Sequence, residues 1–420
     1  MRVYKPSGIE WLGEIPQSWE NVSIRSCFTE SNQRCNTDSY PLLSVTIANG
    51  IIYQDNIENK KDISNDDKSN YKIVPLNAVA YNKMRMWQGA VGVNTLTTGI
   101  VSPAYIVAIP NEKILPNFVS YLFKSKIMIG EFDKNSYGLC LDMNNLRYDD
   151  FRNIKIPLPP LQEQKEIAEF LDSKCEKIQN YIDKKQKLIT LLQEKKQALI
   201  NEVVTKGLNP NIEFKNSEIE YLGLIPHHWE VKKLKHICKI NPQANETLPN
   251  NFVYIDLESV IKGQLLKEQV INKEQAPSRA QRILQKQDIL FQLVRPYQRN
   301  NYIFNKNGDY VASTGYAQIR TKECVNFVYY ALLENSFVER VILKSTGSNY
   351  PAITSNDFAD LKIPLPPLQE QKQIANFLDE KCEKINSVIE KTKKQIELVK
   401  EYKNTLINEA VCGRINLERK

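Results

Sequence analysis

Residues 154–178 read IKIPLPPLQEQKEIAEFLDSKCEKI, and residues 361–385 read LKIPLPPLQEQKQIANFLDEKCEKI. The two stretches lie 207 positions apart and are identical at 21 of 25 positions. A second pair, SGIEWLGEIPQSWE at 7–20 and SEIEYLGLIPHHWE at 217–230, lies 210 positions apart. The chain of 420 residues therefore consists of two copies of one unit, and this internal tandem repeat decides its organisation.

The closing part of each copy is expected to be one long helix. Pro-Leu-Pro-Pro at 157–160 predicts a rigid linker that neither continues a strand nor lies inside a helix. Glu163 and Glu166 then suit the positive end of a helix dipole. No proline or glycine follows until Gly207, which leaves about 45 residues free to form a single helix.

The apolar residues of these helices recur at alternating spacings of four and three, which is the pattern of a coiled-coil seam. We expect the two helices, about 161–205 and 368–411, to bury this seam against each other as an antiparallel pair. Two cysteines lie in the seam, where a packing role is expected. The seam contains Leu171, Cys175, Ile178, Ile182, Ile189, Leu192, Leu199 and Val203 in the first copy, and Leu378, Cys382, Ile385, Ile389, Ile396, Val399, Leu406 and Ala410 in the second.

The middles of the two copies, about 21–150 and 231–357, have diverged almost completely. Both contain short β-type runs separated by Asn, Gly and Asp turns, and one amphipathic helical stretch at about 116–129 or 325–343. The predicted fold class is α+β, with two diverged α+β domains alternating with two long helices in a pseudo-twofold arrangement. The predicted parts are 1–153 (first diverged domain), 154–210 (first long helix), 211–360 (second diverged domain) and 361–420 (second long helix).

A few residues still match between the two diverged middles, and we take these as candidate DNA-binding residues. Arg, Gln and Asn read base edges, Lys and Arg contact phosphates, and an adjacent aromatic ring can pack against a sugar or a thymine methyl group. An Arg-x-aromatic-Gln match could equally be structural, so both interpretations stay open from these residues alone. The candidates are Lys83, Arg85, Trp87, Gln88, Ser102, Tyr105, Asn135 and Tyr137 in the first copy, and Arg295, Tyr297, Gln298, Arg299, Ser313, Tyr316, Ser348, Asn349 and Tyr350 in the second.

The order of these parts resembles the specificity subunits of type I restriction–modification systems over essentially the full chain. The resemblance rests on the Pro-Leu-Pro-Pro-Leu-Gln-Glu-Gln runs at 157–164 and 364–371, and on WLGEIPQSWE and YLGLIPHHWE. It implies that the two diverged domains, 1–153 and 211–360, are target recognition domains and that each reads one half of a split site in double-stranded DNA. It also implies that the helices set the spacing and dock two methyltransferase subunits, which nuclease–translocase subunits then join. The family has no fixed base-contact motif, so the candidate residues above remain an inference from residue type.

Composition bears on the possible binding partners of the protein and on its cellular compartment. The formal net charge of +7 permits a nucleic-acid partner without requiring one. Eight cysteines form no C-x-x-C pair and only three histidines occur, so zinc-site spacing is absent. No signal peptide and no membrane-spanning apolar run is evident. We expect a cytoplasmic protein with reduced thiols and no membrane partner.

Motifs for catalysis are missing from the sequence. There is no N/D-P-P-Y/F motif for amino-methylation, no G-x-G loop for S-adenosylmethionine and no G-x-x-x-x-G-K-S/T loop for ATP. We therefore expect no catalytic residue, no cofactor and no metal site in this chain. The alternative is a coiled-coil scaffold that binds proteins and does not bind DNA in a sequence-specific way. Such a scaffold would not need two diverged domains of about 150 residues.

Overall fold

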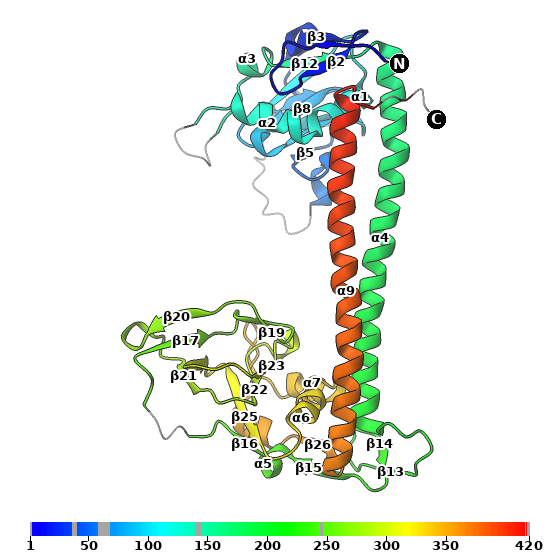
Figure 1. Cartoon of the computed structure of the whole chain (residues 1–420). Helices are drawn as coiled ribbons and strands as arrows, with labels where there is room; N and C mark the ends of the chain where they lie inside the picture. The colour runs from blue at the N-terminus through cyan, green and yellow to red at the C-terminus, as the bar shows by residue number, and fades with distance from the viewer. Residues whose placement is uncertain are drawn as a thin grey trace. The chain divides into compact units, whose positions relative to one another are not determined.

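The computed structural model describes residues 2–35, 40–57, 68–138, 144–243, 247–415 and 417 (Figure 1). The chain divides into two compact units. Unit 1 contains Met1–Lys185 and Lys394–Lys420, and unit 2 contains Gln186–Lys393. Each unit therefore holds one diverged middle together with a part of each long helix.

The two units open with the same small strands. In unit 1, β1 (Tyr4–Pro6) pairs with β2 (Glu14–Pro16), and β3 (Glu20–Ser23) pairs with β12 (Lys155–Leu158). In unit 2, β13 (Phe214–Asn216) pairs with β14 (Leu224–Pro226), and β15 (Glu230–Lys233) pairs with β26 (Lys362–Leu365). All four pairs are antiparallel.

The expectation that Pro-Leu-Pro-Pro could not continue a strand is wrong at its first proline. Pro157 lies in β12 opposite Asn21, and Pro364 lies in β26 opposite Val231. Each of these strands belongs to a two-stranded sheet and has a free edge. Proline is tolerated there because its missing N–H group can face away from the partner strand.

Each diverged middle is built on a four-stranded antiparallel sheet of the same topology. The order is β4-β11-β8-β9 in unit 1 and β16-β25-β22-β23 in unit 2. We call these the recognition sheets. Their strands are β4 (Phe28–Ser31), β11 (Tyr105–Pro110), β8 (Val79–Asn82) and β9 (Val91–Val93), and β16 (Cys238–Ile240), β25 (Tyr316–Thr321), β22 (Asp288–Gln292) and β23 (Tyr302–Phe304).

A second layer of strands differs between the units. Unit 2 has a mixed sheet in the order β20-β17-β24-β21, in which β17 and β24 run parallel. Unit 1 has two separate pairs, β5-β6 and β7-β10, and an isolated parallel bridge joins Leu42 to Ile100. The bounds are β5 (Leu43–Thr46), β6 (Gly50–Tyr53), β7 (Lys72–Val74), β10 (Gly99–Val101), β17 (Asn251–Ile255), β18 (Val260–Ile261), β19 (Gln264–Leu265), β20 (Gln269–Asn272), β21 (Ala280–Ile283) and β24 (Tyr310–Ser313).

The helical stretch expected in each middle is two short helices and not one. In unit 1, the Ser125 hydroxyl accepts from the Met128 N–H group and starts a new helix. In unit 2, the Glu334 carboxylate accepts from two N–H groups at the same place. The helices are α1 (Pro116–Lys124) and α2 (Lys126–Lys134), then α6 (Val325–Leu332) and α7 (Asn335–Leu343). Shorter turns are η1 (Ile24–Ser26), η2 (Gln54–Asn56), α3 (Tyr148–Phe151), α5 (Leu234–Ile237), η5 (Lys273–Gln275) and α8 (Ser355–Ala359).

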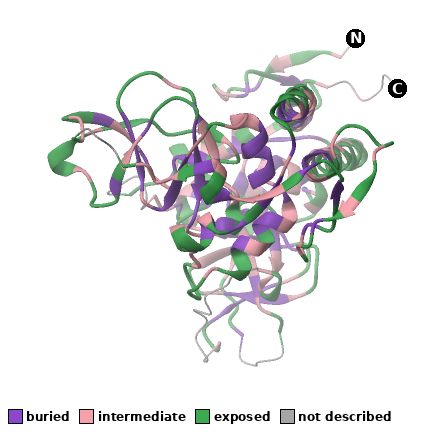
Figure 2. Ribbon diagram, turned by 90° about the horizontal axis from the view of Figure 1, so that it is seen from below, coloured by how far each residue is buried: buried purple, intermediate pink, exposed green. Residues whose placement is uncertain are grey.

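The predicted long helices are confirmed as α4 (Leu161–Lys206) and α9 (Leu368–Val411). Every seam position expected from the sequence is buried or half-buried. Each long helix carries both buried and exposed residues, as Figure 2 shows in the view from below. This is expected for an amphipathic helix. Among the described residues, no helix is both long and apolar enough to cross a membrane.

Each unit has its own hydrophobic core, and both long helices contribute to it. In unit 1, Leu171 near the start of α4 shares a core with Leu406 and Ala410 near the end of α9. In unit 2, Val203 near the end of α4 shares a core with Leu378 near the start of α9. Within each unit, therefore, the end of one long helix packs beside the beginning of the other.

The repeated motif residues join the long helices to the opening strands. The indole N–H group of Trp19 donates to Glu163 at 2.8 Å, and that of Trp229 donates to Glu370 at 3.2 Å. Both indoles are fully buried. Trp19 also contacts the turn that ends α9, because a Cβ at Gly413 would meet its ring at 3.1 Å.

The second glutamine of each Gln-Glu-Gln run is buried and bonds the loop that precedes α1 or α6. Gln164 accepts from the Leu115 N–H group and donates to the Lys113 and Pro159 carbonyls. Gln371 accepts from the Cys324 N–H group in the matching place. These contacts explain the repeated sequence as a structural frame that positions the recognition sheets.

Candidate nucleic-acid interface

A 3₁₀ turn follows the same strand of each recognition sheet. In unit 1 the turn is η3 (Met86–Gln88), which follows β8, and in unit 2 it is η6 (Pro296–Gln298), which follows β22. Both turns contact the second short helix of their unit, α2 or α7. The Arg-x-aromatic-Gln echo of the sequence therefore marks one structural position that occurs twice.

In unit 2 this turn carries a stacked arginine. Arg295 has a left-handed backbone (φ 55°), a conformation that costs energy in a residue with a Cβ. Its guanidinium carbon lies 4.3 Å from the ring centre of Tyr350, which is 65% exposed. Tyr297 is 52% exposed, and Gln298 is exposed beside it. The turn thus carries a guanidinium group next to an aromatic ring, and it exposes the side-chain amide of Gln298 to solvent.

Backbone hydrogen bonds join the segment that follows each late polar loop to the segment that precedes each turn. In unit 1 the Leu146 N–H group donates to the Lys83 carbonyl, and in unit 2 the Ile353 N–H group donates to the Leu293 carbonyl. The Arg295 N–H group also donates to Pro351. The fold therefore brings together the turn and the late loop that the sequence had suggested separately. The loop residues Tyr137, Ser348, Asn349 and Tyr350 are all exposed.

The candidates of unit 1 present a more open surface. Arg85 and Gln88 are exposed, and the Trp87 indole donates to the Met84 carbonyl at 3.1 Å. Burial raises the pKa of Tyr105, while its hydrogen bond to Asn82 and the charge of Arg85 lower it. Lys83 and Ser102 are half-buried.

Several candidates have structural partners that compete with a DNA-binding role. Ser313 and Tyr316 lie in the core, and the Tyr316 hydroxyl donates to the Asp256 carbonyl. Neither side chain can reach DNA in this fold, so we leave both out of the interface. Arg299 donates to Asn335 at 2.7 Å, which ties η6 to α7, and Asn135 donates to the Glu131 carbonyl at the end of α2.

Sequence reasoning missed Lys124, which positions the η3 turn. Its ammonium group donates to the Thr46, Ile47 and Gly89 carbonyls at 3.2, 2.7 and 2.9 Å. Gly89 has a left-handed backbone and ends η3. Burial lowers the pKa of Lys124 to about 8. No pattern in the sequence marks this lysine, because its three acceptors are backbone atoms distant in the chain.

Sequence reasoning also missed a second basic group next to Lys83. Burial lowers the pKa of Lys72, and the nearby charges of Lys83 and Arg34 lower it further. The Glu30 carboxylate, 4.0 Å from the Lys72 ammonium, opposes this effect. Lys72, Lys83 and Arg34 therefore bring positive charge close together, a grouping that suits a phosphate more than a base edge.

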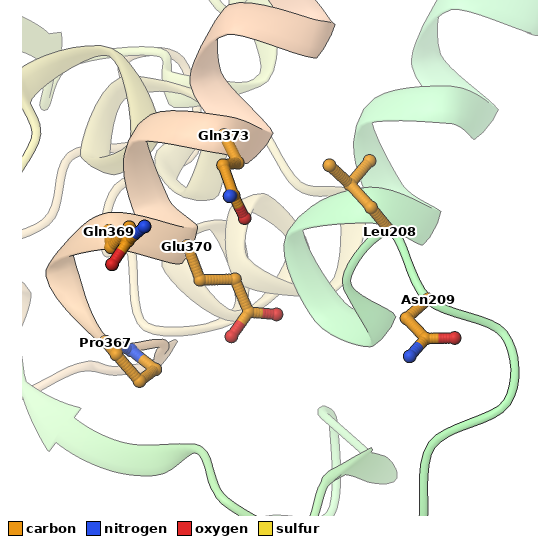
Figure 3. Close-up of a pocket in the computed structure, with 6 residues that line it drawn as sticks. All are labelled: Leu208, Asn209, Pro367, Gln369, Glu370 and Gln373. Carbon is orange, nitrogen blue, oxygen red and sulfur yellow. The ribbon is translucent and has the colours of Figure 1, made fainter.

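Metal-binding groups, thiols and pockets are further kinds of candidate site. The described residues contain no group of three or more His, Cys, Asp or Glu side chains that could hold a metal ion. Burial raises the pKa of the Cys175 and Cys382 thiols, which agrees with a packing role. An open pocket of about 310 Å³ lies in unit 2 between the end of α4 and the start of α9 (Figure 3). It is lined by Leu208, Asn209, Pro367, Gln369, Glu370 and Gln373.

The chain belongs to the family described as type I restriction modification DNA specificity domain, whose model matches residues 16–193 and 226–398. It is 26% identical over 438 residues to a *Methanocaldococcus jannaschii* protein assigned as the type I restriction enzyme MjaX specificity subunit, covering 97% of this chain and 96% of that protein. It is 29% identical over 339 residues to the MjaVIII specificity subunit of the same organism, covering 76% and 75%.

A solved structure from a study of complex assembly and conformational transition of the type I restriction–modification system has the same fold. The TM-score is 0.70 at 17% identity, covering 96% of this chain and 99% of that chain. The two matches to the family model fall on the two copies of the repeat. The duplicated frame read from the sequence is therefore a pair of specificity domains.

Proposed function

We propose that this chain is the DNA-specificity subunit of a type I restriction–modification enzyme and that each unit reads one half of a split site. The observation that carries the proposal is the recurrence of one platform, a recognition sheet with its 3₁₀ turn and pinned loop, in two units whose middles have diverged almost completely in sequence. Unit 1 presents Arg85, Trp87 and Gln88, and unit 2 presents Arg295, Tyr297 and Gln298. Two readers on one frame suit two different targets of the same chemical kind.

The exposed residues of each platform match the chemistry of duplex DNA. Arginine and glutamine form paired hydrogen bonds with base edges in the major groove, while lysine and arginine contact phosphates. We assign Arg85 and Gln88, and Arg295 and Gln298, to base reading. We assign Lys83 to phosphate contact, because the positive charge near it suits an anion.

We further propose that α4 and α9 form an antiparallel coiled coil that separates the two readers. The packing of opposite helix ends within each unit supports it, as does the hydrogen bond from Lys196 to Asn386 in unit 2. The burial of all seam positions supports it as well. Such a pair would set the distance between half-sites and leave its outer faces for other subunits.

The functional boundaries follow from this assignment. Residues 1–153 and 211–360 would be the two target recognition domains, and 154–210 and 361–420 the two conserved helical regions. The partners would be two methyltransferase subunits and, beyond them, nuclease–translocase subunits, in the cytoplasm. The chain itself would bind DNA without catalysing methylation, cleavage or ATP hydrolysis.

The proposal is tested by the methylated sequence motifs of cells with and without this gene, in the presence of the cognate methyltransferase subunit. We expect one split motif to vanish when the gene is removed. The same split sequence should then be bound preferentially in vitro by the chain assembled with that subunit. Loss of no motif, together with equal binding to unrelated duplexes, would contradict the proposal and favour a scaffold.

A further inference from the structure

We propose that the η6 turn of unit 2 presents the amide donors of Gln298 beside the guanidinium of Arg295 at its outer edge and therefore reads a guanine in its half-site. The inference rests on the proposed function, since it assumes that unit 2 reads DNA. It goes further in naming the base, which neither the family nor the relatives specify. Three neighbouring side chains carry it: Gln292, Gln298 and Arg295.

The orientation of the Gln292 amide is fixed by a backbone group. Gln292 is 1% exposed, and its side-chain oxygen accepts from the Asn300 N–H group at 3.3 Å. A backbone N–H group can only donate, so the oxygen of Gln292 must face it. The side-chain nitrogen of Gln292 then points the other way and donates to the Gln298 oxygen at 2.8 Å.

This chain of hydrogen bonds sets which end of Gln298 faces outward. The Gln298 oxygen is bonded to the buried Gln292, so the NH₂ group of the exposed Gln298 side chain faces solvent with two donors. A paired contact with adenine needs one acceptor and one donor, whereas a paired contact with guanine needs two donors. Gln298 held in this way fits an acceptor edge and not adenine.

Arg295 adds further donors beside Gln298. The Gln298 N–H group donates to the Arg295 carbonyl, which keeps the two residues close across the turn. The guanidinium carbon lies 4.3 Å from the ring centre of Tyr350, and its Nε is buried without a hydrogen-bond partner among the described residues, so the terminal NH₂ groups are the donors left for DNA. Arginine cannot accept a hydrogen bond. Gln298 and Arg295 together therefore complement the N7 and O6 acceptors of guanine.

Unit 1 differs at the same position and supplies a control. Gln88 is exposed, and none of the described residues holds its amide in one direction through a side-chain hydrogen bond. The inference therefore applies to unit 2 alone. A polarity change at Gln88 should alter the other half-site or nothing, and never the guanine read by unit 2.

The first test uses the chain assembled with its methyltransferase subunits and a duplex bearing its methylated motif. Each guanine of the half-site that changes when unit 2 is exchanged is replaced in turn by 7-deazaguanine, which lacks the N7 acceptor. We expect one replacement to weaken binding by about tenfold or more. In the Arg295→Ala and Gln298→Ala variants, the same replacement should change the affinity by less than about threefold, because the lost contact is already absent.

The second test reverses the polarity of the turn. In Gln292→Glu, both carboxylate oxygens accept, so Gln298 must turn its NH₂ group inward and its oxygen outward. The preferred base at that position should shift from guanine to adenine or cytosine, which offer donors. Because a buried carboxylate can unfold unit 2, Gln298→Glu places acceptors outward with Gln292 intact and should shift the preference likewise. Gln88→Glu is the matched control.

The outcomes distinguish a failure of the guanine assignment from a failure of the proposed function. A split motif whose second half contains no guanine coupled to Arg295 or Gln298, or whose preference survives Gln298→Glu, would overturn this inference and leave the proposed function intact. Absence of any sequence-specific binding would overturn the proposed function itself. A coupled guanine that is lost in both polarity variants would support the donor edge.

Discussion

The guanidinium carbon of Arg295 lies 4.3 Å from the centre of the Tyr350 ring, and these two residues come from the turn and the loop that form one platform in unit 2. Arg295 reaches this position through a left-handed backbone conformation. Backbone strain of this kind persists only where the surroundings hold it in place, and it is often found at binding sites. The pair links the local geometry of η6 to the proposed contact with DNA.

Arg295→Ala should weaken specific DNA binding by about tenfold or more, because a paired base contact contributes about 1–3 kcal/mol of discrimination. The measurement is the affinity of the assembled complex for its split site and for an unrelated duplex. Tyr350→Phe keeps the stacking ring and should bind as the native chain does. An equal loss on both duplexes with a shallower salt dependence would reassign Arg295 to a phosphate.

Lys124→Met should loosen the support of η3 and lower the free energy of unfolding of unit 1 by about 1–3 kcal/mol, since three backbone carbonyls lose a charged donor. The lowered pKa gives this effect a pH dependence. Between about pH 8 and the ordinary value of 10.5, the unfolded chain holds a proton on Lys124 that the folded chain has released. The stability advantage of the native chain over the variant should therefore grow as pH rises through this range.

Denaturant unfolding of both proteins at a series of pH values provides the measurement. A stability difference that stays constant from pH 8 to 10.5 would show that the three carbonyls hold the proton on Lys124 despite its burial. A variant as stable as the native chain at every pH would remove the positioning role altogether.

Glu163→Ala should destabilise unit 1 by about 1–3 kcal/mol, because the buried indole N–H group of Trp19 loses its acceptor. Glu163→Gln is the matched control, since its amide oxygen can still accept. Glu370→Ala should act in the same way on unit 2 through Trp229. Denaturant unfolding should show the loss for each alanine variant, and a glutamine variant as unstable as the alanine one would assign the effect to lost charge.

The sequence predicted the repeat, the long helices and their seams, because these features depend on local periodicity and on the absence of proline and glycine. It failed where context outside the local stretch decides. The edge position of β12 admits Pro157, and the hydroxyl of Ser125 divides one amphipathic stretch into two helices. Both outcomes depend on neighbours that a linear pattern does not show.

The candidate interface was predicted in part for the same reason. The match of Ser102 and Tyr105 with Ser313 and Tyr316 marks a shared turn between strands, and in unit 2 that turn is buried. Residue type alone could not separate this structural echo from the exposed echo at Arg295. The donors of Lys124 and the relay through Gln292 join groups that are distant in sequence or depend on backbone polarity, so only the structure shows them.

Lengthening both long helices should lengthen the spacer of the DNA site if they separate the readers. A four-residue insertion at Leu199–Glu202 would disturb unit 2, because Asn201 accepts a hydrogen bond from the Asn335 N–H group. The insertion is therefore better placed elsewhere in the helix. Duplicating residues 190–193 together with residues 385–388 adds about 6 Å and nearly one turn to each helix. We expect the methylated motif to gain one or two base pairs of spacer with unchanged half-sites. An active variant with the native spacer would show that the helices merely tether the readers.

Each unit is expected to read its own half of one split DNA site. The most direct measurement is the methylated motif of cells in which residues 1–153 are exchanged for the matching segment of a relative with a different motif. We expect one half of the motif to change to that of the relative and the other half to stay the same. A motif changed in both halves, or in neither half while methylation continues, would contradict this expectation.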